Sequence, residues 1–230
     1  MYTALAYIAA FIIAFLLGSV PWGVIMSKLL FHDDVRQHGS GNIGMTNVWR
    51  TYGAKAGLLV FVLDFAKGLL SGVVAALAFA LWQTACPEYG SFDIFARTAT
   101  GVAAEVQTTC IGLAFLGCVW GHIFSPWLGF KGGKGIAVAV GCLFVTFGPA
   151  LALGEFALFL VVVLLTRYIS AGSIASAVAC PFFALYVFWG YWPAWACCTI
   201  AGLTVVWAHR ANIKRLASGT ESTFNLKKDK

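Results

Sequence analysis

The stretch "AKAGLLVFVLDFAKGLLSGVVAALAFALW", residues Ala54 to Trp82, decides the fold class. A helix needs about 20 apolar residues to cross the hydrocarbon core of a bilayer, and this stretch is longer. The whole chain of 230 residues is 60% hydrophobic and only 10% charged, which is too apolar for an ordinary soluble domain. We therefore expect an all-α integral membrane protein, with residues 1–230 forming a single polytopic membrane domain.

Six further apolar runs bring the expected number of transmembrane helices to seven. The fourth run is short, because at roughly 1.5 Å per residue it barely crosses a bilayer, and a re-entrant segment is the alternative. Pro21 predicts a kink in the first run. The six runs are at about Thr3–Leu30, Thr100–Phe124, Gly135–Phe147, Gly148–Thr166, Gly172–Trp189 and Trp192–Ala208.

The distribution of basic residues predicts the orientation. With seven helices, the loops on one side contain Arg97 as their only basic residue. The loops on the other side share that side with the C-terminus and are rich in Lys and Arg, so the positive-inside rule places the N-terminus outside and the C-terminus in the cytosol. The basic residues on the C-terminal side are Lys28, Arg36, Arg50, Lys55, Lys131, Lys134, Arg167, Arg210, Lys214, Arg215, Lys227, Lys228 and Lys230.

The loop "FKGGKG", residues Phe130 to Gly135, combines glycines with two lysines just before the fourth apolar run. Successive free backbone N–H groups can form an anion-binding nest, and the positive end of the following helix would point at the same place. Lys131 and Lys134 add charge, so the loop suits a phosphate group. It is no Walker A loop, since Gly135 follows Lys134. The alternative is a tight interfacial turn whose lysines snorkel to water.

A second polar cluster, "GSGNIGMTNVWR", spans residues 39–50. Ser40, Asn42, Thr46 and Asn47 offer neutral hydrogen bonds, and Arg50 offers a bidentate fork for phosphate. The alternative is that Thr46 or Asn47 only caps the helix that follows. Capping explains one polar residue of the cluster but not five, so the pattern favours a binding role.

A third cluster, "HRANIKRLASGTE", spans residues 209–221. His209 and Asn212 are three residues apart, so on a helix they share one face and are the candidate functional residues here. Arg215 and its neighbouring cations are explained by the inner end of a helix.

Charged residues inside the apolar runs call for a structural explanation. Asp64 and Lys67 are spaced to pair on one helix face. Glu105 and Glu155 lie near outer helix ends, where interfacial exposure would explain both. The seven cysteines form no CxxC pair, and no Cys/His spacing indicates a metal site or a cofactor.

Together with "GHIFSPWLGFKGGKGIA", residues 121–137, these clusters resemble, in the same order, the three signatures of the bacterial acyl-phosphate-dependent glycerol-3-phosphate acyltransferases, the PlsY family. The resemblance implies transfer of a fatty acyl group from acyl phosphate to the sn-1 hydroxyl of glycerol 3-phosphate, giving lysophosphatidic acid and phosphate without metal or cofactor. It implies catalytic roles for His209, Lys134 and Arg50. The substrate-binding residues would be Ser40, Gly41, Asn42, Thr46, Asn47, Lys131, Gly132, Gly133, Gly135, Ser173 and Asn212.

The resemblance also implies a place in the cell, namely the bacterial cytoplasmic (inner) membrane, with the active site facing the cytosol. The expected partners are the two substrates, membrane lipid and the enzyme that makes acyl phosphate, but no nucleic acid. The general base is left open between His209, His122 and a phosphate oxygen of the substrate. A transporter for an organic or inorganic phosphate is the alternative function, although no internal repeat supports it.

Overall fold

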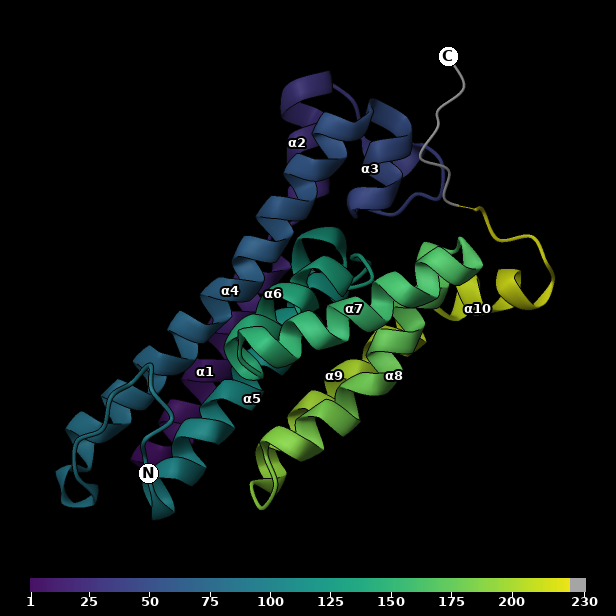
Figure 1. Cartoon of the computed structure of the whole chain (residues 1–230). Coiled ribbons are helices and arrows are strands. Elements are labelled where there is room, and N and C mark those ends of the chain that lie inside the picture. Colours follow the sequence, from purple (N-terminus) through teal and green to yellow (C-terminus); the bar gives the residue numbers. More distant parts are fainter. Residues whose placement is uncertain (224–230) are drawn as a thin grey trace.

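A computed structural model describes residues 1–223, and within that range the chain consists of helices joined by turns (Figure 1). Lys227, Lys228 and Lys230, which entered the orientation argument, lie outside the described residues. The α-helices are α1 (Tyr2–Ser19), α2 (Trp22–Phe31), α3 (Met45–Tyr52), α4 (Ala54–Ala85), α5 (Gly101–Ile123), α6 (Ile136–Thr146), α7 (Pro149–Thr166), α8 (Ile169–Val187), α9 (Trp192–Ala208) and α10 (Arg210–Ala217). Short 3-10 turns occupy Val35–Gln37, Pro87–Tyr89 and Pro126–Leu128.

Each predicted apolar run contains a helix. The first run is interrupted between Ser19 and Trp22, as Pro21 predicts, and so forms α1 and α2. Within residues 1–223, five stretches are long and apolar enough to cross a membrane, whereas α6 and α9 are shorter apolar helices. These lengths and compositions are those of an integral membrane protein built from helices. The short helix α3, which precedes a longer apolar run, was not predicted, and α10 was expected only as a continuation of the last run.

Helix α5 is the centre of the bundle and packs against α1, α4, α6 and α9. In its most apolar window 78% of the residues are buried, the largest share among the five candidate spans. Small residues allow this close packing. A Cβ atom added to Gly121 would lie 2.0 Å from the carbonyl oxygen of Phe15 in α1, so a larger residue there would force the two helices apart.

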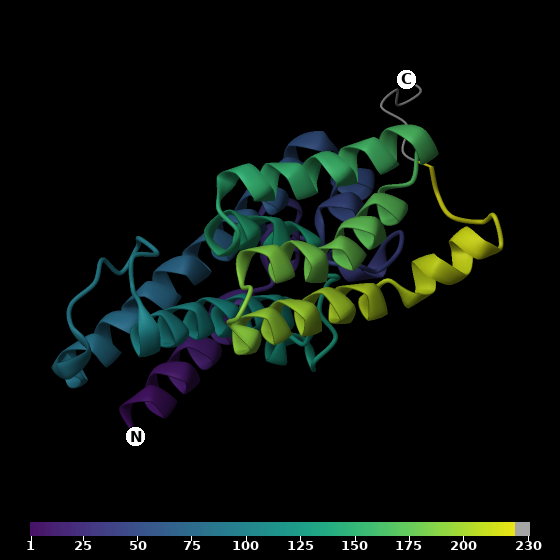
Figure 2. The same ribbon diagram turned by 60° about the horizontal axis from the view of Figure 1, so that its bottom comes forward.

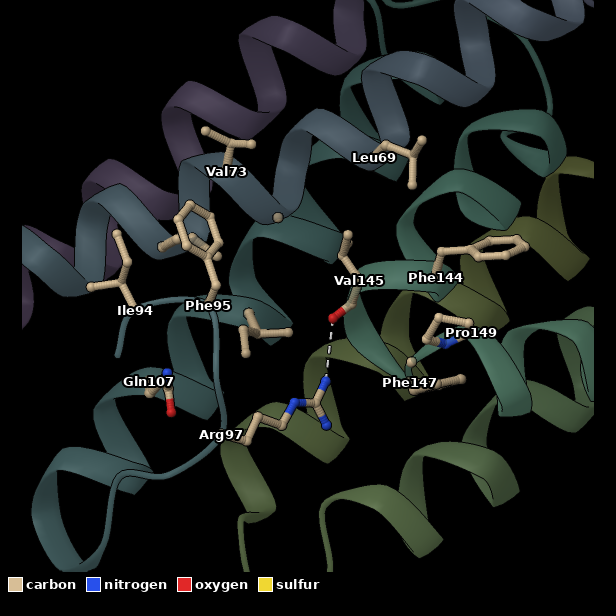
Figure 3. A pocket seen from close by; sticks show the side chains of 15 residues that line it. Leu69, Val73, Ile94, Phe95, Arg97, Gln107, Phe144, Val145, Phe147 and Pro149 are labelled. Carbon is tan, nitrogen blue, oxygen red and sulfur yellow. Dashed lines mark hydrogen bonds between the residues drawn. The ribbon is translucent and has the colours of Figure 1, made fainter. Parts of the chain in front are cut away.

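Helix α6 is short, and hydrogen bonds from another segment hold its C-terminal end. At its C-terminal end, the guanidinium of Arg97 donates hydrogen bonds to the carbonyl oxygens of Val145, at 3.3 Å, and of Thr146. Figure 3 shows Arg97 reaching this helix end across a cavity of about 490 Å³. These bonds satisfy carbonyls that have no partner within the helix. Pro149 then occupies the first position of α7, where its missing N–H costs nothing.

The two ends of the molecule differ. Figures 1 and 2 show the N-terminus and the loop of residues 86–100 at one end, and α3 and α10 toward the other. Helix α7 lies obliquely across the bundle in Figure 1, with α8 packed against it. Arg97 thus lies apart from the end where α3 and α10 gather the polar clusters.

Candidate functional site

A cleft of about 870 Å³ brings the three polar clusters together. One part of its wall is mainly polar and comes from α3 and the loop before it, the loop before α6, the start of α8 and α10. The other part is mainly apolar and comes from α4, α6, α7 and α9. Of the predicted site residues, Gly41, Lys131, Gly132 and Gly133 do not line the cleft. Those that do line it are Ser40, Asn42, Thr46, Asn47, Arg50, Lys134, Gly135, Ser173, His209 and Asn212.

The glycine-lysine loop is folded back on the end of α5. The N–H of Gly132 donates to Ile123 O at 2.9 Å, and the N–H of Gly133 donates to His122 O at 3.0 Å. The expectation of a nest of free N–H groups is therefore wrong for these two glycines, whose donors are already used. Lys131 is exposed. Lys134 and the first turn of α6 remain available to an anion. The N–H groups of this turn have no acceptors within the helix. They follow Gly135, which is the N-cap and has a φ of 85°.

Lys134 is the cation at the centre of the polar end. Burial, together with the nearby charges of Arg215 and Arg50, lowers the pKa of Lys134 to about 8, although Glu221 acts in the opposite direction. Cations from three separate segments therefore meet at one place. Such mutual repulsion is relieved when a bound anion lies among them.

His209 presents one ring nitrogen for hydrogen bonding in the cleft. Its Nδ1 lies 2.8 Å from Val205 O, and because a carbonyl can only accept, Nδ1 carries the hydrogen. Nε2 is then an acceptor. Burial lowers the pKa of His209 to about 4. The positive charge of Lys134 acts in the same direction, whereas the hydrogen bond to Val205 raises the pKa. The ring is therefore neutral at physiological pH.

Glu221 ties the third cluster to α8. Its Oε1 accepts hydrogen bonds from Ser170 Oγ at 2.9 Å and from Asn212 Nδ2 at 2.7 Å, and its Oε2 accepts one from Arg215 Nε at 2.6 Å. Burial alone would raise the pKa of Glu221, but these three donors outweigh it and lower the pKa. Asn212 Oδ1 is buried and has no hydrogen-bond partner among the described residues, so an acceptor is left for a ligand.

Sequence reasoning missed two members of this network, Ser170 and Arg215. Arg215 was explained by its helix end alone, yet it lines the cleft and contributes to the charge around Lys134. The available signal was its spacing of three residues from Asn212, which places both on one face of α10. Nothing in the sequence around Ser170 indicated that it would lie beside Glu221.

In the first cluster, hydrogen bonds show which side chain holds the loop in shape. Asn47 Oδ1 accepts from the Ser40 N–H at 3.0 Å, and Asn47 Nδ2 lies within 3.1 Å of three carbonyl oxygens, those of Val35, His38 and Asn42. This side chain holds the loop in shape. The capping alternative is wrong, because Thr46 and Asn47 lie within α3, and neither α3 nor α4, whose N-caps are Gly44 and Gly53, has a side-chain cap.

A buried polar cluster supports the glycine-lysine loop from behind. Lys67 Nζ lies 2.9 Å from Asp64 Oδ1, which confirms the predicted pairing, and 3.0 Å from His122 Nδ1. Because the ammonium donates to Nδ1, His122 carries its hydrogen on Nε2 and has no acceptor nitrogen to offer. A Cβ atom on Gly133 would lie 2.1 Å from this Nε2, so the imidazole occupies the space that glycine leaves.

Glu155 departs from its expected environment. Interfacial exposure was expected for Glu105 and Glu155, and Glu105 is indeed exposed. Glu155, however, is only 3% exposed and lines the apolar part of the cleft. Within residues 1–223, no group of three His, Cys, Asp or Glu side chains is arranged to hold a metal ion.

Fold and cleft together define a class: a polytopic helical membrane protein in which a cationic, glycine-rich site adjoins an apolar cavity. Residues 8–219 match the family model described as glycerol-3-phosphate acyltransferase, and the chain belongs to this family. It is 37% identical over 210 residues to the glycerol-3-phosphate acyltransferase of Thermosynechococcus vestitus, covering 91% of each chain. It is 39% identical over 212 residues to that of Trichlorobacter lovleyi, covering 92% and 94% of the two chains.

A solved structure has the same fold. The crystal structure of PlsY (YgiH), an integral membrane glycerol 3-phosphate acyltransferase, in its glycerol 3-phosphate form, is 33% identical and matches with a TM-score of 0.72. The match covers 97% of this chain and 96% of the other. The lysophosphatidic acid form of that protein matches equally well, with a TM-score of 0.72.

Proposed function

We propose that the protein transfers a fatty acyl group from acyl phosphate to the sn-1 hydroxyl of glycerol 3-phosphate, giving lysophosphatidic acid and phosphate. The observation that carries this proposal is the cleft, in which cationic residues of three segments adjoin an apolar cavity. One substrate is a small water-soluble phosphate and the other carries a long apolar chain. Family membership supports the acceptor and the product, as do the glycerol 3-phosphate and lysophosphatidic acid forms of the related PlsY structure.

The polar end suits the phosphate groups. Lys134, Arg50 and the start of α6 would hold them, with Ser40 as a neutral donor from the facing loop. Asn212 Oδ1, which is buried and unpartnered, would accept a hydrogen bond from a glycerol hydroxyl. We assign bracing roles to Asn47, Gly132 and Gly133, whose polar groups bond within the chain.

The chemistry requires little more than positioning. The attacking hydroxyl oxygen bonds to the acyl carbon, the bond from that carbon to the phosphate oxygen breaks, and the hydroxyl proton ends on the released phosphate. His209 Nε2 accepts the hydrogen bond of the hydroxyl and orients it, while Lys134 and Arg50 stabilise the charge that develops on the leaving phosphate. A pKa of about 4 makes His209 a weak base, which is why the proton is assigned to the departing phosphate.

We further propose that residues 1–230 form one membrane domain with seven transmembrane helices, in which α1 and α2 together cross once. The N-terminus lies outside and the site faces the cytosol of a bacterium, across its cytoplasmic membrane. The contrast between the two ends supports this orientation, since Arg97 lies at one end and Arg50, Lys134 and Arg215 lie toward the other. The enzyme that makes acyl phosphate would then supply its product from the same side.

The decisive experiment uses purified protein, radiolabelled glycerol 3-phosphate and palmitoyl phosphate, without CoA or added metal. We expect lysophosphatidic acid from the parent and from Lys131→Ala, the matched control on the exposed lysine, and little from Lys134→Ala. Equal loss in both lysine variants would contradict the assignment of the site. No product from the folded parent would refute the reaction, and flux measurements in proteoliposomes would then test transport of phosphate compounds.

A further inference from the structure

Glu155 is a buried carboxyl group to which the proposed chemistry gives no role. It lies on α7 and is 3% exposed, and its Oε2 has no hydrogen-bond partner among the described residues. Within residues 1–223 it takes part in no ion pair within 4.0 Å, unlike Asp64, Asp34 and Glu221. A buried polar oxygen without a partner is unfavourable, so its presence calls for an explanation.

The carboxyl group lines the apolar part of the same cleft. Phe156, Phe159 and Leu160 of α7 line the cavity around it, and α8 packs alongside α7 in both overall views (Figures 1 and 2). Helix α8 contributes polar groups to this wall, namely Ser170, Ser173 and Ser176. A line of hydroxyl groups therefore leads from the polar end into the apolar part.

The two ends of this line are fixed by hydrogen bonds. Ser170 Oγ donates to Glu221 at the polar end, and Ser176 Oγ donates to the backbone oxygen of Glu155 at 3.4 Å. Six residues of helix separate the two serines, which corresponds to roughly 9 Å along the axis. An extended chain of carbon–carbon bonds advances about 1.25 Å per bond, so the level of Ser176 and Glu155 lies about seven bonds, at C8, along an acyl chain whose carbonyl carbon is placed at the level of Ser170.

We propose that Glu155 determines acyl-chain specificity, and that the cleft accepts acyl donors carrying a hydroxyl group near the middle of the chain, which hydrogen-bonds to the Glu155 carboxyl. This inference rests on the proposed acyl transfer. A purely apolar chain leaves the Glu155 oxygen without a partner, whereas a mid-chain hydroxyl satisfies it. A site built around a hydroxyl group discriminates strongly against substrates that lack it, because its own polar group is then left unpaired.

The test compares 8-hydroxyhexadecanoyl phosphate with hexadecanoyl phosphate as donors, with radiolabelled glycerol 3-phosphate as acceptor. The measured quantity is the ratio of kcat/KM for the two donors. Both are assayed with the same protein preparation, so a loss of folded protein lowers both values equally and leaves the ratio unchanged. For the parent we expect the ratio to favour the hydroxylated donor by about 10-fold or more. Glu155→Leu should reverse this preference, and Glu155→Gln, which keeps hydrogen-bonding groups, should retain part of it.

Two controls make the test specific. Leu160→Met changes the same wall while conserving its volume, and it should leave the ratio unchanged. A 16-hydroxylated donor places the hydroxyl group beyond Glu155 and should gain nothing from the carboxyl. A ratio near one in the parent, or the same ratio in Glu155→Leu, would overturn the inference while leaving the acyl transfer intact. Failure of both donors in the folded parent would instead overturn the proposed function, and this inference with it.

Discussion

Raising the pH should inactivate the free protein by neutralising Lys134. Burial and the neighbouring arginines place the pKa of Lys134 at about 8, well below the usual value for lysine of about 10.4. At pH 9 only about one-tenth of the molecules then keep the ammonium, against about nine-tenths at pH 7. Because kcat/KM reports groups in the free enzyme, kcat/KM for glycerol 3-phosphate should fall about 10-fold between these two pH values.

The assay measures initial rates of lysophosphatidic acid formation from pH 6.5 to 10, in the parent and in Lys134→Arg. A guanidinium stays protonated throughout this range, so any activity that the variant retains should not fall near pH 8. At saturating glycerol 3-phosphate, the fall in kcat should move to higher pH, because a bound phosphate dianion favours the ammonium. A parallel fall in parent and variant, or a parent profile that is flat to pH 10, would refute the assignment.

Three further predictions address the surroundings of the site. Gly133→Ala, whose methyl group would meet the imidazole beneath the loop, should lower kcat/KM by about 10-fold or more. Gly154→Ala should not, because its methyl group would only make an ordinary contact with the Phe183 ring at 3.8 Å. Lys67→Met should lower the free energy of unfolding by about 3–5 kcal/mol, since it leaves a buried carboxylate unpaired. The control Arg36→Ala, which removes an exposed ion pair, should lower it by less than about 1 kcal/mol. Thermal unfolding in detergent measures both. His209→Phe should lower kcat about 100-fold with folding unchanged, and full activity in this variant would exclude His209 from the reaction.

The helical segments could be predicted from the sequence because hydrocarbon imposes length and composition on them. Even the interruption at Pro21 and the shortness of α6 could be predicted. Helix α3 escaped prediction because it is brief, amphipathic and directly precedes a longer helix, whereas α10 was expected only as a continuation of the last apolar run. Their contribution is large, since α3 positions Arg50, and α10 positions Asn212 and Arg215.

The sequence could predict that most of the candidate residues lie together at one cleft, but not what each side chain does there. Asn47 and Arg50 both belong to the first cluster, yet only hydrogen bonds in three dimensions show that Asn47 is occupied in bracing the loop. The same applies to Gly133, whose N–H bonds to α5. Glu155 shows the opposite error. Its position along the helix predicted an exposed side chain. The prediction failed because the packing of α7 on α8 and across the cleft depends on contacts distant in sequence.

The lowered pKa of Lys134 and the suitability of the site for phosphate have the same physical origin. The burial and the cationic neighbours, Arg50 and Arg215, that make the ammonium unfavourable in the empty cleft make a phosphate dianion favourable there. Glu221 offsets part of this charge, but its oxygens are engaged by Arg215 and two neutral donors. The arginine repulsion raises the free energy of the empty site and is released on binding, so affinity for phosphate and the titration of Lys134 must change together when Arg50 or Arg215 is altered.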